Sequence, residues 1–278
     1  MSDYKTLLVH YDAGRTAPVR LETAIELAGT FGAHVACLYA LSVYPMPSHA
    51  AEAGELFVEA RERAQAEMLA AARHGYEECL RRTGFDRAEW RTSKADALDA
   101  VTLQARYADL VVVGQKNPEW PSGVNKDFEH SVPLAAGRPV LVVPYAFERR
   151  PVGQRVLVAW NASREAARAV SDALPLLKRA RQVQVVAFRP EKSAAAHGEE
   201  PGADIALYLA RHGVKVTVSR YDAPDVDIGN QLLSRAFDLS ADLIVMGAWG
   251  HSRLRELVLG GATRTLLDSM TVPVLMAH

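Results

Sequence analysis

The sequence predicts a doubly wound α/β protein made of two tandem units, each a five-stranded, mainly parallel sheet with helices on both faces. One observation is the alternation of short, continuously apolar segments with segments of helical periodicity. The other is an internal repeat: LLVHYDAGRTAPVRLETAIEL at 7–27 aligns without gaps on VLVAWNASREAARAVSDALPL at 156–176. Two more pairs follow in the same order: ADLVVVG at 108–114 with ADLIVMG at 241–247, and RPVLVVP at 138–144 with VPVLMAH at 272–278.

The repeat divides the chain into a first half, residues 1–146, and a second half, residues 153–278. Between them the segment AFERRPVGQR at 146–155 is polar and contains Pro and Gly, which is typical of a linker. We therefore expect two domains joined by a short connection.

In the second half, apolar runs predict strands near 155–160, 183–188, 214–219, 242–247 and 273–277. A helix should follow the first strand, with Ser163 as its N-cap. Pro175 falls inside this helix and is expected to bend or end it, because proline lacks the amide donor that a helix interior uses.

The first half follows the same plan with one insertion, LSVYPMPSHAAEAG at 41–54, and a long helix from about Glu55 to Arg82. This helix is rich in Ala, Glu and Arg, so it has high helical propensity and an outer face suited to water.

The charge balance gives no reason to expect nucleic acid or membrane partners. Of the 278 residues, 32 are Lys or Arg and 33 are Asp or Glu, and the two signs are mixed along the chain. The chain contains no apolar stretch of the roughly 18 residues that a membrane helix requires. Cys37 and Cys79 lie far apart without metal-ligand spacing, so we expect reduced thiols in a cytoplasmic protein.

The stretch GAWGHSRLRELVLGGATRTLL, 247–267, directly follows an apolar strand and contains four glycines. In an open α/β sheet, ligands bind where the carboxyl ends of the strands lead into helices. Glycines allow a ligand to approach backbone N–H groups, and a helix that begins near Gly261 would direct its free N–H groups at an anion. Thr263 adds a hydroxyl, while His251, Arg253 and Arg264 add polar or positive character. The pattern indicates a phosphate site, although turn and packing glycines give the same spacing.

Other known motifs are absent from the sequence. Neither G-x-x-x-x-G-K-[ST] nor G-x-G-x-x-G after the first strand occurs, and neither do H-E-x-x-H and G-x-S-x-G. We therefore assign no catalytic residue and no metal ligand. His10 lies within a strand and is interpreted as a packed or hydrogen-bonded residue, and the acidic run Asp222, Asp225 and Asp227 as a loop with a helix cap.

The spacing Gly247-x2-Gly250-x9-Gly260, placed after the fourth strand of a five-strand unit, resembles the ATP-binding signature of the universal stress protein family. Two copies over essentially the whole chain resemble its double-domain bacterial members. The resemblance implies flavodoxin-like or Rossmann-like units and ATP as the ligand, with Mg²⁺ as an accompanying ion if hydrolysis occurs. The implied nucleotide-binding positions are Ala159, Asn161, Phe188, Met246, Gly247, Gly250, Gly260, Gly261, Ala262 and Thr263.

The chain departs from the family pattern in both halves. Asn161 stands where the family has Asp, and Gly261 stands where it usually has Ser or Thr. The first half keeps Asp12 but has Asn117 and Asp127 at glycine positions, so its nucleotide site is expected to be degenerate.

The resemblance implies a stress-response regulatory protein that binds ATP or a related adenine nucleotide through the second half. A nucleotide-independent scaffold and a slow ATPase are the alternatives, and the sequence identifies no residue that would position a hydrolytic water. Single-domain members pair through their last strands, so PVLVVPY is expected to pair with VPVLMAH within the chain, with a homodimer of whole chains as a further option. Trp160 and Trp249 either wall the ligand pocket or pack over the rim of the sheet.

Overall fold

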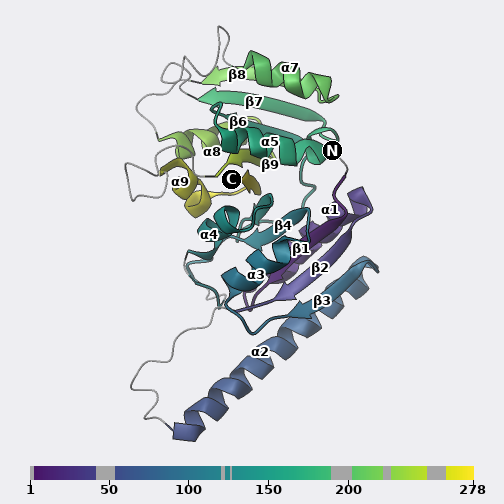
Figure 1. Ribbon diagram of the computed structural model, residues 1–278, viewed down its shortest axis with the longest axis vertical. Helices are drawn as coiled ribbons and strands as arrows, with labels where there is room; N and C mark the ends of the chain where they lie inside the picture. The colour runs from purple at the N-terminus through teal and green to yellow at the C-terminus, as the bar shows by residue number, and fades with distance from the viewer. Residues whose placement is uncertain are drawn as a thin grey trace.

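The computed structural model describes residues 3–41, 54–119, 123–125, 127–188, 202–221, 227–248 and 261–278. One ten-stranded sheet runs through both halves in the order β3-β2-β1-β4-β5-β10-β9-β6-β7-β8 (Figure 1). The strands of the first half are β1 (Thr6–Tyr11), β2 (His34–Tyr39), β3 (Ala88–Thr92), β4 (Leu110–Gly114) and β5 (Val140–Val143). Those of the second half are β6 (Arg155–Trp160), β7 (Gln182–Phe188), β8 (Val216–Tyr221), β9 (Leu243–Gly247) and β10 (Val274–Ala277).

Strands β5 and β10 join the two halves as an antiparallel pair, in which Val142 lies opposite Val274 and Leu141 opposite Leu275. All other strand pairs in the described ranges are parallel. The expected pairing of the two last strands is confirmed. Because the seam is antiparallel, the carboxyl edge of one half lies beside the amino edge of the other.

Helices cover both faces of the sheet, as the alternation of apolar and helical segments predicts. One face packs against α1 (Ala17–Phe31), α2 (Gly54–Thr83), α5 (Arg164–Leu177) and α7 (Ala203–Arg211). The other packs against α3 (Ala97–Ala105), α4 (Phe128–Ala135), α8 (Ile228–Asp238) and α9 (Gly261–Ser269). The two layers bury strand side chains from both faces, which is why the strands read as unbroken apolar runs.

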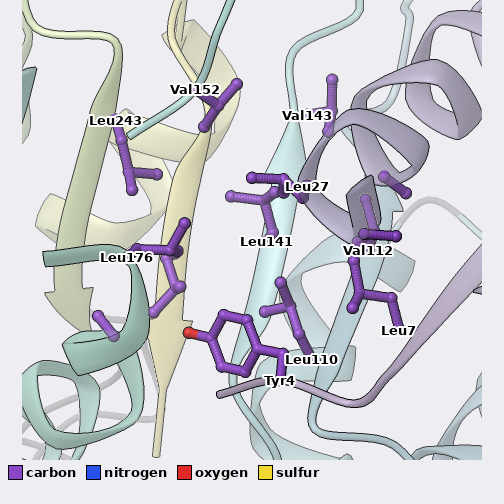
Figure 2. Close-up of a cluster of buried hydrophobic side chains, with 14 of the residues drawn as sticks. Tyr4, Leu7, Leu27, Leu110, Val112, Leu141, Val143, Val152, Leu176 and Leu243 are labelled. Atoms are coloured by element: carbon purple, nitrogen blue, oxygen red, sulfur yellow. The ribbon is translucent and has the colours of Figure 1, made fainter. Parts of the chain in front are cut away.

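The core is continuous across the seam. Leu27 on α1 and Leu141 on β5 lie in the same buried cluster as Leu176 on α5 and Leu243 on β9 (Figure 2). The hydroxyl of Tyr4 donates to the backbone carbonyl of Asp172 at 2.7 Å, which adds a hydrogen bond between the halves. The halves are therefore one packed unit and not two bodies on a tether.

Helix α2 matches the predicted long helix and extends beyond the sheet at its amino-terminal end (Figure 1). Its carboxyl-terminal half packs on the sheet through Ala72, Tyr76 and Cys79, which are buried. Cys37 and Cys79 are buried free thiols. Among the described residues, no helix combines the length and the apolar character that crossing a membrane requires.

In the second half one predicted strand is shifted, and the helix that contains Pro175 ends soon after the proline. The strand expected at 214–219 lies at Val216–Tyr221, because α7 is closed by Gly213 at φ +81 and by a hydrogen bond from the Val214 N–H to the Leu209 carbonyl. Helix α5 continues two residues past Pro175 and ends at Leu177. Proline is therefore accommodated in the last turn of α5.

Candidate functional site

The candidate site lies at the carboxyl edge of the second half, between β6 and β9. Here β6 leads into α5 and β7 on one side, while β9 lies on the other, so adjacent connections leave the sheet in opposite directions. Such a switch point is where open α/β sheets leave a crevice for ligands. Both α5 and α9 follow strands of this parallel sheet and run back across it, so their amino-terminal ends face this edge.

The turn after β6 is fixed by local hydrogen bonds. The Asn161 side-chain oxygen accepts from the Ser163 N–H at 3.1 Å, and the Ser163 hydroxyl accepts from the Ala166 N–H at 3.1 Å, which confirms the predicted N-cap of α5. Ala162, between them, has φ 56, a left-handed conformation that non-glycine residues rarely adopt. Because the Asn161 oxygen is used within the turn, its amide NH2 is the group that an exposed Asn161 offers to a ligand.

Gly247 at the end of β9 is needed for close packing. A Cβ atom there would lie 2.5 Å from the Ala166 backbone nitrogen and 2.8 Å from the Glu165 Cβ. The first turn of α5 therefore rests directly on the end of β9. The absence of a side chain at Gly247 thus allows the end of β9 and the start of α5 to lie in contact beside the crevice.

Helix α9 begins at Gly261, which is exposed, and continues through Ala262 to Thr263, which is buried at 4% exposure. The first N–H groups of a helix have no partner within the helix, so in the described part of the chain this end directs donors toward the carboxyl edge. Helix α8 approaches closely here: a Cβ on Gly229 would lie 2.9 Å from the Ala262 carbonyl oxygen and 2.7 Å from the Thr265 Cβ.

The other predicted nucleotide-binding residues lie on β6, β7 and β9 or outside the described residues. Ala159 is half-buried within β6, and Met246 is buried at 7% exposure toward α8 and α9. Phe188 ends β7, the strand beside β6, and pairs with Tyr221. Gly250, Gly260 and Trp249 lie outside the described residues. The structure thus brings the ends of β6, β7 and β9 and the start of α9 to one edge.

Sequence reasoning did not single out Glu165, in the first turn of α5. Its side chain is buried, with one oxygen 2.6 Å from the Arg164 Nε and the other, Oε2, without a hydrogen-bond partner in the described part of the chain. Burial raises the pKa of Glu165, but the Arg164 contact and its own backbone N–H outweigh this effect and leave the pKa below the usual value. An ionised acceptor therefore adjoins Gly247. The sequence pattern does not distinguish Glu165 as a site residue, because acidic residues are common in the first turn of any helix.

The corresponding edge of the first half is filled by its own side chains. The Arg20 guanidinium lies 2.9 Å from the Asp12 carboxylate and directly against Gly114, with both charged side chains buried. In the gapless repeat Arg20 corresponds to Ala169 and Asp12 to Asn161. His10 is fully buried and donates through Nε2 to the Ala40 carbonyl at 2.8 Å, which confirms a packed, hydrogen-bonded residue.

The acidic residues before α8 act as a helix cap where the structure describes them. The Asp227 carboxylate caps α8 by accepting from the Gly229 and Asn230 N–H groups, as the cap interpretation predicts, whereas Asp222 and Asp225 lie outside the described residues. In the described ranges, no cluster of three or more His, Cys, Asp or Glu side chains could hold a metal ion.

A known protein family matches the sequence of both halves. The model of the Universal stress protein family matches residues 3–144 and again residues 153–278. A universal stress protein from Archaeoglobus fulgidus DSM 4304 superposes with a TM-score of 0.68 at 16% identity, covering 98% of this chain and 97% of that chain. A functionally unknown protein from Pseudomonas aeruginosa PAO1 gives a TM-score of 0.59 at 16% identity, covering 99% and 92%. No curated protein matches the sequence. At these identities the solved structures establish the fold alone.

Proposed function

Because this chain belongs to the universal stress protein family, we propose that it is a stress-response regulatory protein whose second half binds ATP or a related adenine nucleotide. The observation that carries the proposal is that the exposed Asn161 amide, after β6, and the amino-terminal turn of α9, which follows the adjacent strand β9, lie at the same edge of the sheet. The amide suits the polar edge of an adenosine group, and the helix end suits phosphate.

The residues at this edge fit such a ligand. The turn at Ala162 holds a left-handed conformation, which is a kind of strain that concentrates at binding sites. Within the described residues the buried Glu165 Oε2 atom has no hydrogen-bond partner, so a carboxylate with an unused acceptor lies beside this turn. A bound Mg²⁺ would offset the charge of the triphosphate beside this carboxylate.

The proposal assigns the nucleotide to the second half and not to the first. In the first half the Arg20 guanidinium occupies the space against Gly114, whereas the second half has the small side chain of Ala169 at the corresponding position. The first half also has a buried carboxylate, Glu129, in the first turn of α4, where a phosphate would otherwise meet the helix. An anion would be repelled there whenever Glu129 is ionised.

The test is direct binding with matched variants. Purified protein is extracted and analysed for co-purified adenine nucleotide, and calorimetry with ATP, ADP and GTP measures affinity in the presence and absence of Mg²⁺. Gly250→Glu and Gly260→Glu place a carboxylate in the proposed phosphate loop and are expected to abolish binding.

The matched control is Asn117→Glu, which adds the same charge at the first-half position that corresponds to Gly250. It should leave nucleotide affinity unchanged. Wild-type affinity in both glycine variants, or no heat with any purine nucleotide at millimolar concentration, would contradict the proposal.

A further inference from the structure

Gln115, the residue after β4, crosses from the first half to the second. Its side chain is buried at 6% exposure, and its amide nitrogen donates to the carbonyls of Leu267 at 2.8 Å and Asp268 at 3.2 Å. Its side-chain oxygen accepts from the Tyr145 N–H at 3.1 Å. All three bonds are made, so one amide of the first half holds the last turn of α9.

The antiparallel seam explains why this contact is available. Because the carboxyl edge of the first half lies beside the amino edge of the second, the end of β4 meets the point where α9 finishes before β10. Helix α9 therefore spans between two edges. Its first turn faces the proposed nucleotide site, and its last turn adjoins the corresponding edge of the first half.

Among the described residues, the equivalent position of the second half does not make the reverse contact. In the repeat, Gln115 corresponds to Ala248, whose side chain carries no hydrogen-bonding group. Through Gln115 the first half thus supports the helix of the second half, whereas Ala248 offers α4 no side-chain hydrogen bond. A seam that served only to join two equivalent halves would not need this asymmetry.

Other contacts hold α9 between its neighbouring helices α8 and α4. On one side Gly229 of α8 packs directly against Ala262 and Thr265. On the other side the His130 Nε2 of α4 lies 3.6 Å from the Asp268 carboxylate. A helix of this length spans about 13 Å, so a displacement of its last turn is carried to its first turn.

We propose that Gln115 is a positioning residue through which the first half controls the nucleotide site of the second half. By fixing the end of α9, Gln115 holds the N–H groups of its first turn where phosphate meets them. The inference rests on the proposed function, because the regulated event is nucleotide binding. Thermodynamic linkage makes the effect reciprocal: if contact with the first half strengthens binding, bound nucleotide strengthens that contact. Nucleotide binding in the second half should then change the stability of the edge of the first half around Gln115.

The first experiment compares Gln115→Met with Tyr4→Phe. The methionine keeps the length of the side chain and removes the three hydrogen bonds, while Tyr4→Phe removes a hydrogen bond between the halves that ends on α5 and not on α9. Gln115→Met is expected to weaken nucleotide affinity by about 5- to 30-fold, as the loss of the two hydrogen bonds that end on α9 implies, and Tyr4→Phe to change it less than about twofold. Equal affinities in Gln115→Met and the wild type would overturn the proposal.

Hydrogen exchange without nucleotide separates this inference from the function on which it rests. In Gln115→Met, amides of 261–269 should exchange faster than in the wild type while those of α5 stay unchanged, whether or not the protein binds nucleotide. Unchanged exchange in α9 would overturn the support role even if the wild type binds ATP.

A wild-type measurement covers the case in which Gln115→Met does not fold. Nucleotide added to the wild-type protein should slow exchange in α9 and also at Gln115 and in α4 of the first half, while β3 stays unchanged. Protection confined to the second half would overturn the inference.

Discussion

The Arg20 guanidinium lies 2.9 Å from the Asp12 carboxylate, with both side chains buried at the carboxyl edge of the first half. The same positions in the second half are Ala169 and Asn161. One repeat thus carries an internal ion pair where the other carries a small apolar residue and an amide. This difference supports our proposal that the second half, and not the first, binds the adenine nucleotide.

Removal of Arg20 should strongly destabilise the protein. Arg20→Ala leaves the Asp12 carboxylate buried without its partner, which typically costs about 3–5 kcal/mol in the free energy of unfolding. The double variant Asp12→Asn, Arg20→Ala recreates the residue pair of the second half and should recover at least half of that loss. Urea denaturation of the two variants measures both effects, and a double variant no more stable than Arg20→Ala would contradict the prediction.

Gly247→Ala should destabilise the protein by about 1–3 kcal/mol, because the new Cβ meets the backbone of α5 and not a flexible side chain. The control is Gly29→Ala on α1, where a Cβ has nothing within 4 Å. That change should stabilise the protein by up to about 1 kcal/mol, since alanine favours a helix over glycine. Thermal denaturation compares the two. A neutral Gly247→Ala would mean that α5 does not rest on β9.

Glu129 should make stability fall as the pH rises. Burial raises its pKa to about 7 from an ordinary value of 4.5, and the Lys116 N–H bond opposes the shift only in part. Between pH 4.5 and pH 7 the folded state keeps a proton that the unfolded state loses, so the free energy of unfolding decreases through this window.

Glu129→Gln preserves the acceptor without the ionisation. Relative to this variant, the wild type should lose about 2 kcal/mol of stability between pH 5 and pH 8. Lys116, His130 and Asp268 face the same region in both proteins, so their contributions largely cancel in the difference. Parallel pH profiles for the two proteins would contradict the assignment.

His10 should remain neutral in the folded protein well below its usual pKa. Burial lowers its pKa to about 4, against the opposing attraction of Asp12. Since the unfolded chain takes up the proton below about pH 6.5, this residue stabilises the fold fully above that pH and loses its contribution as the pH falls toward 4. Nitrogen-15 NMR of the imidazole should show a neutral ring protonated on Nε2 at pH 5.5. An imidazolium signal at that pH would contradict the buried, hydrogen-bonded geometry.

The sequence by itself determined the repeat, the α/β class and most of the elements. Continuous apolar runs located the strands because parallel strands are buried on both faces. Local signals also located the cap at Ser163, since a cap depends on residues adjacent in the chain. The similarity between 138–144 and 272–278 pointed to the β5–β10 seam by resemblance to a known family.

Only the tertiary structure decided how the residues at the strand ends are used. Arg20 reaches Gly114 across 94 positions of sequence, and Gln115 reaches Leu267 across 152. Glu165 gives no periodic signal, and its burial arises where α5 rests on β9. Periodicity and capping report interactions within a turn or a strand. Which side chain fills the space between elements distant in the sequence depends on packing in three dimensions, and this packing is what distinguishes the two halves.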